Sequence, residues 1–277
     1  MSDPLVAANW LAERLDEPDL AVIDASWHMP GSGRDARAEY LTAHIPGAVF
    51  FDIDEIADHT SDLPHMLPAP ADFAQAMGAL GISQDMRIVV YDSLGLFSAP
   101  RVWWTLRVFG VAKAFVLDGG LPAWIAEGRS IETGQPEPRP CRFRPRAAPS
   151  LVADWREVLR ASTTGAAQII DARAADRFCG AADEPRAGLR RGHVPGSLNL
   201  PWTRLVSDGR LRSEPELREE FERAGTIAGK PIVTSCGSGV SAALLSLALE
   251  RIGAGSAVYD GSWTEWGGRA DLPIATD

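Results

Sequence analysis

Short apolar runs rich in β-branched residues alternate along this chain with longer segments whose apolar positions recur at the period of a helix. Each predicted helix ends near a glycine, and the helices cover residues 70–82, 99–111, 216–227 and 239–254. Strands that alternate with helices imply a mainly parallel sheet flanked by helices, so the pattern predicts an α/β fold. In such sheets, binding sites lie at the carboxyl ends of the strands.

The same signals occur twice, in the same order and at nearly constant spacing. The paired segments are 20–27 with 168–175, 43–52 with 192–202, 87–99 with 231–242, and 115–128 with 257–268. An internal repeat of this length predicts two tandem domains of one fold. Asp24, Asp171, His44 and His193 recur in both halves, so we expect them to be structural.

The domain boundaries follow from a change in composition between the two copies. Residues 131–149 are rich in proline and basic side chains and show no periodicity, which is typical of an extended linker. We therefore expect an N-terminal domain over residues 1–130 and a C-terminal domain over residues 150–277.

Composition narrows the classes of function. The apolar fraction of 45% and charged fraction of 23% are those of a soluble globular protein, and a formal net charge of -10 argues against a nucleic-acid partner. No stretch has the length of a membrane helix, so no membrane contact is expected. The first residues lack the pattern of a signal peptide, so the expected location is the cytoplasm.

The most informative of the three cysteines is Cys236. Three cysteines are too few for a disulfide framework, and no pair has the spacing of zinc ligands. Cys236 follows a predicted strand and precedes Gly237, Ser238 and Gly239, after which a helix opens near Val240. Backbone N–H groups of this turn and the helix N-terminus would form an anion cradle, which suits a nucleophilic thiolate or an anion carried on its sulfur.

Two further features of this loop bear on that interpretation. A lone cysteine at a strand end can also be a small buried residue with no chemistry. In the first half, however, the equivalent position holds Asp92 in a longer loop, DSLGLFSA, without a thiol. One half therefore carries a nucleophile and the other does not.

The duplicated H-[IV]-P-G and D-G-[GS] motifs, FFDID…HMLP in the first half and CGSGVS in the second resemble the rhodanese superfamily. Within it, the chain is similar over essentially its whole length to the tandem-domain sulfurtransferases that use 3-mercaptopyruvate. The resemblance implies two rhodanese-like domains, an inactive N-terminal one and a catalytic C-terminal one. It implies that Cys236 becomes a persulfide, that pyruvate is released, and that a thiol such as thioredoxin, or cyanide, accepts the sulfur, with no metal or organic cofactor.

The resemblance also assigns substrate-binding residues. The spacing of Arg177 and Arg186 matches the two arginines that hold the keto-acid, and a guanidinium fork fits a planar carboxylate. Taken alone, both would be read as solvated surface arginines. Arg190 and Arg191 are expected to add only positive potential.

The loop composition separates two sister activities. The thiosulfate-using enzymes resemble C-R-K-G-V-T, in which a basic pair suits a dianionic donor. Gly237 and Ser238 are uncharged, which favours mercaptopyruvate; Gly239 and Val240 complete the substrate-binding loop. A thiosulfate sulfurtransferase with the same persulfide is the alternative. Cell-cycle dual-specificity phosphatases share the rhodanese fold but need a C-x5-R loop to bind phosphate. No arginine follows Cys236 at that spacing, so a phosphatase activity is disfavoured.

Besides a nucleophile and substrate-binding residues, the expected sulfur transfer needs a group that transfers protons. Asp54 and His65 match the spacing of an Asp-His pair that acts with the loop serine, Ser238. Such a relay could protonate the departing enolate or activate the donor thiol. Alternatively, His65 only packs at a domain interface.

Three other possibilities stay open at this point. Cys179 could form a regulatory disulfide with Cys236. The chain could be a non-catalytic sulfur-binding or scaffold protein. A hydrolase centred on Ser238 is disfavoured, because Cys236 replaces the first glycine of the G-x-S-x-G motif.

Overall fold

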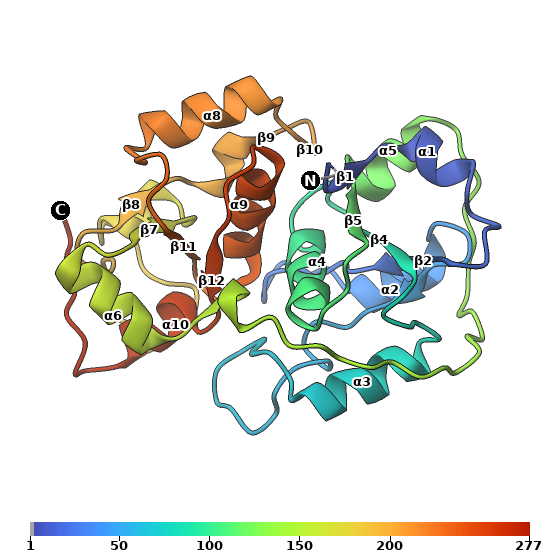
Figure 1. The fold of residues 1–277 in the computed structure, drawn as a ribbon, viewed down its shortest axis with the longest axis horizontal. Helices are drawn as coiled ribbons and strands as arrows, with labels where there is room; N and C mark the ends of the chain where they lie inside the picture. Colours follow the sequence, from blue (N-terminus) through green and yellow to red (C-terminus); the bar gives the residue numbers. More distant parts are fainter. Residues whose placement is uncertain (1–2) are drawn as a thin grey trace. The chain divides into compact units, whose positions relative to one another are not determined.

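The computed structural model describes residues 3–277, which form two compact units (Figure 1). Unit 1 contains the described residues up to His59, together with Leu67–Ala148 and Asp208–Leu211. Unit 2 contains Thr60–Met66, Pro149–Ser207 and Arg212–Asp277. No helix within residues 3–277 combines the length and the apolar character needed to span a bilayer.

Unit 1 alternates short strands with helices. Its elements are β1 (Leu5–Val6), α1 (Ala8–Ala12), β2 (Leu20–Asp24), α2 (Ala36–Thr42), β3 (Val49–Phe50), α3 (Pro70–Ala79), β4 (Arg87–Tyr91), α4 (Ala99–Val108), β5 (Ala114–Leu117), α5 (Gly120–Ala126) and β10 (Arg210–Leu211).

Unit 2 repeats that alternation. Its elements are β6 (Val152–Ala153), α6 (Trp155–Thr164), β7 (Gln168–Asp171), α7 (Ala175–Phe178), β8 (Leu198–Asn199), β9 (Val206–Ser207), α8 (Glu214–Arg223), β11 (Ile232–Ser235), α9 (Val240–Arg251), β12 (Ala257–Tyr259) and α10 (Ser262–Gly268). Two 3-10 turns, Pro149–Leu151 and Trp202–Leu205, complete it.

Each unit is built on a five-stranded parallel sheet, and the two sheets have the same topology. The strand orders are β1-β5-β4-β2-β3 and β6-β12-β11-β7-β8, which is one order when the strands of each five-stranded sheet are counted along the chain. Helix α4 packs on β4 and β5, and its counterpart α9 packs on β11 and β12. The predicted α/β fold and internal repeat are confirmed.

The predicted helices are present with shifted ends. The helix expected over residues 216–227 runs instead over Glu214–Arg223. It begins early because Ser213 and Glu216 form a reciprocal capping box, and it ends before Gly225, whose φ of 92° is left-handed. The helix expected over residues 239–254 runs over Val240–Arg251.

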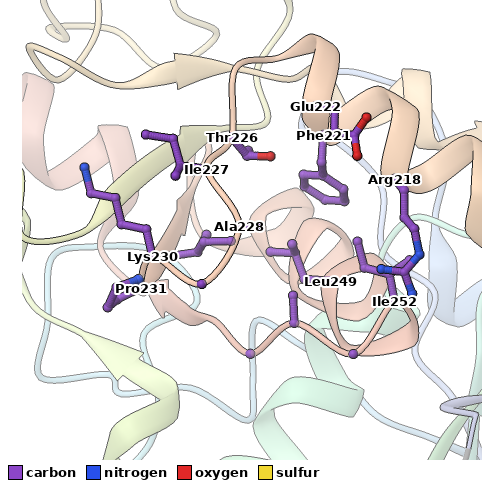
Figure 2. A pocket seen from close by; sticks show the side chains of 15 residues that line it. Arg218, Phe221, Glu222, Thr226, Ile227, Ala228, Lys230, Pro231, Leu249 and Ile252 are labelled. Atoms are coloured by element: carbon purple, nitrogen blue, oxygen red, sulfur yellow. The ribbon is translucent and has the colours of Figure 1, made fainter.

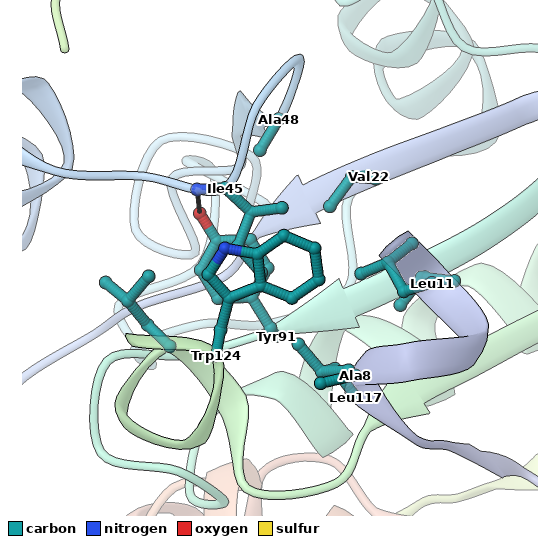
Figure 3. Packing of buried hydrophobic residues seen from close by; sticks show 10 residues of the cluster. Ala8, Leu11, Val22, Ile45, Ala48, Tyr91, Leu117 and Trp124 are labelled. Atoms are coloured by element: carbon teal, nitrogen blue, oxygen red, sulfur yellow. Dashed lines mark hydrogen bonds between the residues drawn. The ribbon is translucent and has the colours of Figure 1, made fainter. Parts of the chain in front are cut away.

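Apolar side chains from strands and helices of unit 1 form one dense core (Figure 3). Leu11 of α1, Val22 of β2, Tyr91 of β4 and Trp124 of α5 meet there, and all are at most 5% exposed. The hydroxyl of Tyr91 accepts the backbone N–H of Ile45 at 3.2 Å, so the polar end of this buried ring has a partner. The packing fixes β4, whose carboxyl end carries Asp92.

The segment expected to be a linker is extended, but it is attached to unit 1. Phe143 is 4% exposed and meets the ring of Phe73 edge-on, with the centroids 5.3 Å apart. The N–H of Arg146 donates to the carbonyl of Phe109 at 2.9 Å. This part of the chain is therefore a packed strap rather than a loose tether.

A buried aspartate at the end of β2 gives unit 1 a pH-dependent stability. Asp24 is 1% exposed, and burial raises the pKa of its carboxyl to about 6. The equivalent Asp171 in unit 2 is bridged by Arg173, whereas unit 1 has Ser26 at that place, whose N–H donates to Asp24 at 2.8 Å. Ionising Asp24 thus requires a buried charge without an arginine partner.

We expect the contribution of Asp24 to the free energy of unfolding to fall as pH rises from about 4 to about 6. In this range most unfolded carboxyls have released their proton while the folded one still binds it, so the contribution decreases with pH, by roughly 3 kcal/mol in all. Asp24→Asn removes this pH-dependent contribution, because an amide does not ionise. Urea unfolding followed by tryptophan fluorescence at several pH values should show the variant gaining on the wild type as pH rises; a pH-independent difference would contradict the assignment.

Candidate functional site

The thiol of Cys236 lies at the carboxyl end of β11, where the backbone turns into α9. The residue is 2% exposed, and its Sγ accepts the N–H of Gly239 at 3.1 Å. Gly239 caps α9 with a φ of 79°, a conformation that glycine adopts without strain. The sulfur therefore lies at the positive end of a twelve-residue helix, where negative charge is stabilised.

Three hydrogen bonds to the start of α10 hold the loop in place. The carbonyl of Cys236 accepts the N–H of Trp263 at 2.9 Å. The carbonyl of Gly237 accepts the N–H of Thr264 at 2.9 Å and its hydroxyl at 2.7 Å. With the carbonyls turned toward α10, the loop can present N–H groups toward the sulfur.

The first half shows what such a loop can bind. The carboxylate of Asp92 accepts four backbone N–H groups at 2.7 to 2.9 Å, those of Leu94, Phe97, Ser98 and Ala99. The backbone carbonyl of Asp92 accepts the N–H of Leu121 at 3.0 Å. This hydrogen bond is the counterpart of the one that the N–H of Trp263 donates to the backbone carbonyl of Cys236. The cradle of unit 1 is thus filled by an anion from its own chain, whereas unit 2 has a sulfur at that position.

Ser262 is a site residue that the sequence analysis missed. It is fully buried and has a φ of 49°, a left-handed conformation that costs a non-glycine residue about 1–3 kcal/mol. Its hydroxyl oxygen accepts the N–H of Cys236 at 3.1 Å and lies 4.0 Å from Sγ. The corresponding residue of unit 1 is Gly120, with a φ of 51°. Comparing the two halves for a serine that replaces a glycine would have found it.

Arg177 lies directly against the loop that follows Cys236. A Cβ atom added to Gly237 would be 3.1 Å from Nη2 of Arg177. The same guanidinium is paired with Glu184, to which Nε donates at 3.3 Å and Nη2 donates through a second, short bond. Glu184 also accepts Nη1 of the buried Arg173 at 2.7 Å. Arg173 and Glu184 were missed too, and their sequence context, a charged loop, gave no signal of burial.

Arg186 contacts His65, the residue predicted to take part in proton transfer. Its Nη2 lies 3.3 Å from Nε2 of His65, which requires that nitrogen to be the unprotonated one if Arg186 donates to it. His65 is 6% exposed and has a φ of 60°, which is uncommon for a residue other than glycine. The structure therefore brings together one predicted substrate-binding residue and one predicted catalytic residue.

The remaining members of the predicted relay are distributed over the two units. Ser238, at 7% exposed, belongs to unit 2 with His65. Asp54 belongs to unit 1, where its Oδ2 accepts the indole N–H of Trp27 at 2.9 Å. The relay of Ser238, His65 and Asp54 stays a prediction.

The residues that recur in both halves have structural contacts. Nδ1 of His44 lies 2.8 Å from the carbonyl of Tyr40, and Nδ1 of His193 lies 2.9 Å from the carbonyl of Phe178. Each imidazole stacks on the ring of that same residue. Both histidines are at most 3% exposed. Each histidine therefore ties its own segment to the preceding helix, α2 in unit 1 and α7 in unit 2.

Arg190 and Arg191 differ in their contacts from Arg177 and Arg186, the predicted substrate-binding pair. Arg190 donates to the carbonyls of Trp266 and Gly267 at the end of α10, and to that of Leu272 in the segment after it, all at 3.0 Å, and so caps that helix. Arg191 pairs with the exposed Asp183 at the surface. The structure thus gives Arg190 a structural contact in place of the general positive potential expected from sequence.

The three cysteines are free thiols of unequal accessibility. Cys141 and Cys179 are exposed, and Cys236 is buried. Sγ of Cys179 lies 3.6 Å from the carbonyl of Asp176, at the end of α7. Only Cys236 has the helix N-terminus and the donor N–H that suit a nucleophile.

A cavity of about 540 Å³ opens at the other end of β11 and α9 (Figure 2). Phe221, Leu249 and Ile252 form its apolar wall, and Figure 2 shows the side chain of Lys230 directed away from its centre. Because it adjoins the first residue of β11, it lies away from the edge of the sheet that carries Cys236. It is therefore separate from the candidate active site.

The chain matches a known protein family and several characterised relatives. The family model for the rhodanese-like domain matches residues 7–127 and 154–269. The chain is 51% identical over 271 residues to the 3-mercaptopyruvate sulfurtransferase of Escherichia coli strain K12, covering 97% of this chain and 96% of that one. It is also 44% identical over 275 residues to the thiosulfate sulfurtransferase of Bos taurus, covering 96% and 92%.

A solved structure agrees in fold over nearly the whole chain. SseA from Escherichia coli, described as a 3-mercaptopyruvate sulfotransferase with the rhodanese fold, superimposes with a TM-score of 0.88 at 48% identity. The match covers 95% of this chain and 99% of that one.

Proposed function

The chain belongs to the rhodanese family, and from this premise we propose that it is a sulfurtransferase that moves the sulfur of 3-mercaptopyruvate to a thiol or cyanide through a persulfide on Cys236. One observation carries the proposal: Sγ of Cys236 accepts the N–H of Gly239 at the head of α9, beside an uncharged loop and an arginine. Relatives with both donor names are similar to the chain, so family membership alone does not choose the donor.

The first half-reaction loads the enzyme. The thiolate of Cys236 attacks the sulfur of the donor, which forms a sulfur–sulfur bond and breaks the carbon–sulfur bond. The electron pair of that bond passes to the carbon and gives the enolate of pyruvate, which takes up a proton. Loop N–H groups and the dipole of α9 stabilise charge on the persulfide. We propose the relay of Ser238, His65 and Asp54 as the source of the proton.

The second half-reaction regenerates the thiol. A thiolate acceptor attacks the outer sulfur, and Sγ of Cys236 leaves as a thiolate. We propose a thiol such as thioredoxin as the acceptor, and the cytoplasm as the setting because the cycle needs reduced thiols. The net charge of -10 supports a small-molecule donor rather than a nucleic-acid partner.

We propose Arg177 and Arg186 as the groups that bind the carboxylate and ketone of the donor. Both belong to unit 2 with Cys236, and Nη2 of Arg177 lies next to Gly237. We also propose an inactive domain over residues 1–130 and a catalytic domain over residues 150–277, joined by residues 131–149. The two regions matched by the family model flank this linker.

The donor preference tests the proposal. We expect kcat/KM to be higher for mercaptopyruvate than for thiosulfate, because the loop positions Gly237 and Ser238 carry no charge to attract a dianion. Replacing the pair with Arg-Lys should shift the preference toward thiosulfate, in part because a Cβ at position 237 would lie only 3.1 Å from Nη2 of Arg177 and press on it. Steady-state kinetics with both donors measures this, and a wild type that prefers thiosulfate would favour the alternative, a thiosulfate sulfurtransferase.

A further inference from the structure

A carboxylate that the sequence analysis did not single out is buried beside the catalytic loop. The side chain of Glu184 is 2% exposed, although it lies in an irregular, charged loop. Carboxylates are almost never buried this far unless they are paired. Glu184 accepts hydrogen bonds from Arg173 on one side and from Arg177 on the other.

Arg173 ties this carboxylate to the sheet. Its side chain is 1% exposed, it donates to both carboxylate oxygens of Asp171, and its Nη2 donates to the carbonyl of Gly192 at 2.8 Å. The guanidinium carbon lies 4.3 Å from the ring centre of Trp263. Asp171 is the partner of Ser235 in the register of β7 and β11, and Ser235 directly precedes Cys236. Glu184 is therefore held by a rigid element next to the nucleophile.

The pairing uses one specific edge of Arg177. Nε and Nη2 donate to the two oxygens of Glu184, which is the side-on arrangement of a guanidinium and a carboxylate. The end-on edge, formed by Nη1 and Nη2, points away from Glu184. A planar group held by one edge has its other edge fixed in direction, so Glu184 aims the remaining fork of Arg177.

Gly237 provides the room for that fork. Its φ is outside the left-handed region, so the backbone does not require glycine there. The constraint is space, because a Cβ would lie 3.1 Å from Nη2 of Arg177, so the guanidinium would have to shift by a few tenths of an ångström and change its contacts with Glu184. Gly237, Arg177 and Glu184 thus form one fitted set.

We propose that Glu184 is a positioning residue that holds Arg177 over the catalytic loop, in the space left by Gly237, and thereby selects a keto-acid carboxylate as donor. This inference rests on the proposed function. Asp171, Arg173, Glu184 and Arg177 together carry two positive and two negative charges. Loss of the Glu184 charge frees the fork of Arg177, which opposes oriented binding of the keto-acid. It also leaves a surplus positive charge, which favours a small dianion.

The test is Glu184→Gln assayed with both donors. We expect KM for mercaptopyruvate to rise about tenfold with kcat nearly unchanged, since the lost contact orients the bound donor. For thiosulfate we expect kcat/KM to stay level or rise. The matched control is Glu214→Gln, which removes an exposed partner of Arg218 on α8 and should change neither donor. An equal fall for both donors would overturn the inference, because it would mean that Glu184 only supports the fold.

A double-mutant cycle shows whether Glu184 acts through Arg177. In the Arg177→Ala background, Glu184→Gln should change KM for mercaptopyruvate by less than about twofold. Gly237→Ala provides a second cycle that leaves the buried charges intact, in case Glu184→Gln does not fold. It should raise KM in the wild-type background and have little effect in the Arg177→Ala background. Additive effects in these cycles would overturn the inference.

Mass spectrometry separates this inference from the proposed function. If mercaptopyruvate adds one sulfur to Cys236 of the wild type and Glu184→Gln behaves as the wild type, the positioning role is wrong and the function stands. If the wild type gains no sulfur on Cys236, the proposed function falls and the inference falls with it. Sulfur on Cys236 together with the split between donors supports both.

Discussion

Cys236→Ser is expected to abolish sulfur transfer from either donor while the protein keeps its fold. A hydroxyl can accept the N–H of Gly239 as the thiol does, so the loop should survive, but oxygen cannot carry the transferred sulfur. Turnover should fall by roughly a thousandfold or more, as expected for loss of the nucleophile in covalent catalysis. The measurement is pyruvate release, with circular dichroism and the unfolding midpoint as checks on the fold.

The location of the transferred sulfur completes this test. After addition of mercaptopyruvate, mass spectrometry of the wild type should show one extra sulfur on the peptide that contains Cys236. Cys179→Ser is the matched control, since Cys179 is an exposed thiol without a helix N-terminus, and it should retain transfer. Sulfur on Cys179 or Cys141 instead would refute the assignment of the nucleophile.

Arg177→Ala and Arg186→Ala should each lower kcat/KM for mercaptopyruvate by roughly thirtyfold or more. Losing one partner of a charged, hydrogen-bonded contact in a desolvated site typically costs about 2–5 kcal/mol, and about 1.4 kcal/mol corresponds to tenfold. Arg→Lys should restore only part of the loss, since an ammonium cannot reproduce the guanidinium fork. Steady-state kinetics measures this, and Arg191→Ala, which alters an exposed surface pair, is the control.

The two half-reactions distinguish substrate binding from support of the loop. We expect transfer from a preformed persulfide to a thiol to be nearly unchanged in both arginine variants, because the keto-acid has already left. Each variant can be loaded chemically with persulfide and followed through a single turnover. Equal losses in both half-reactions would mean that the arginines hold the loop, and wild-type rates throughout would mean that they are surface residues.

The fold was predictable because each local signal agrees with the topology. Apolar runs ending at Asp24 and Asp171, glycine stops after the helices and the internal repeat all point to two parallel sheets, and both sheets have the same strand order. The ends of the helices were predicted less accurately than the helices themselves. A capping box such as Ser213–Glu216 is formed by polar side chains, so the spacing of apolar residues gives no information about it.

The site was only partly predictable. Cys236, Gly239 and Val240 could be placed because a strand end, a turn and a helix start are consecutive in sequence. Arg173 and Glu184 could not, because charged residues in a loop are usually solvated and only tertiary pairing buries them. Differences between the halves would have helped: Arg173 replaces Ser26, and Ser262 replaces Gly120, in the half that carries the thiol.

The chain does not pass only once from unit 1 to unit 2. Thr60–Met66, with His65, is part of unit 2 although it precedes most of unit 1, and Asp208–Leu211 is part of unit 1 although it follows much of unit 2. Severing the polypeptide within residues 131–149 would therefore leave each fragment without a piece of its own unit. The two copies have become interdependent: the copy that carries Cys236 is no longer a module that can be excised or grafted elsewhere as one continuous segment. A circular permutant or a split reporter built on this chain would need to preserve both exchanged segments.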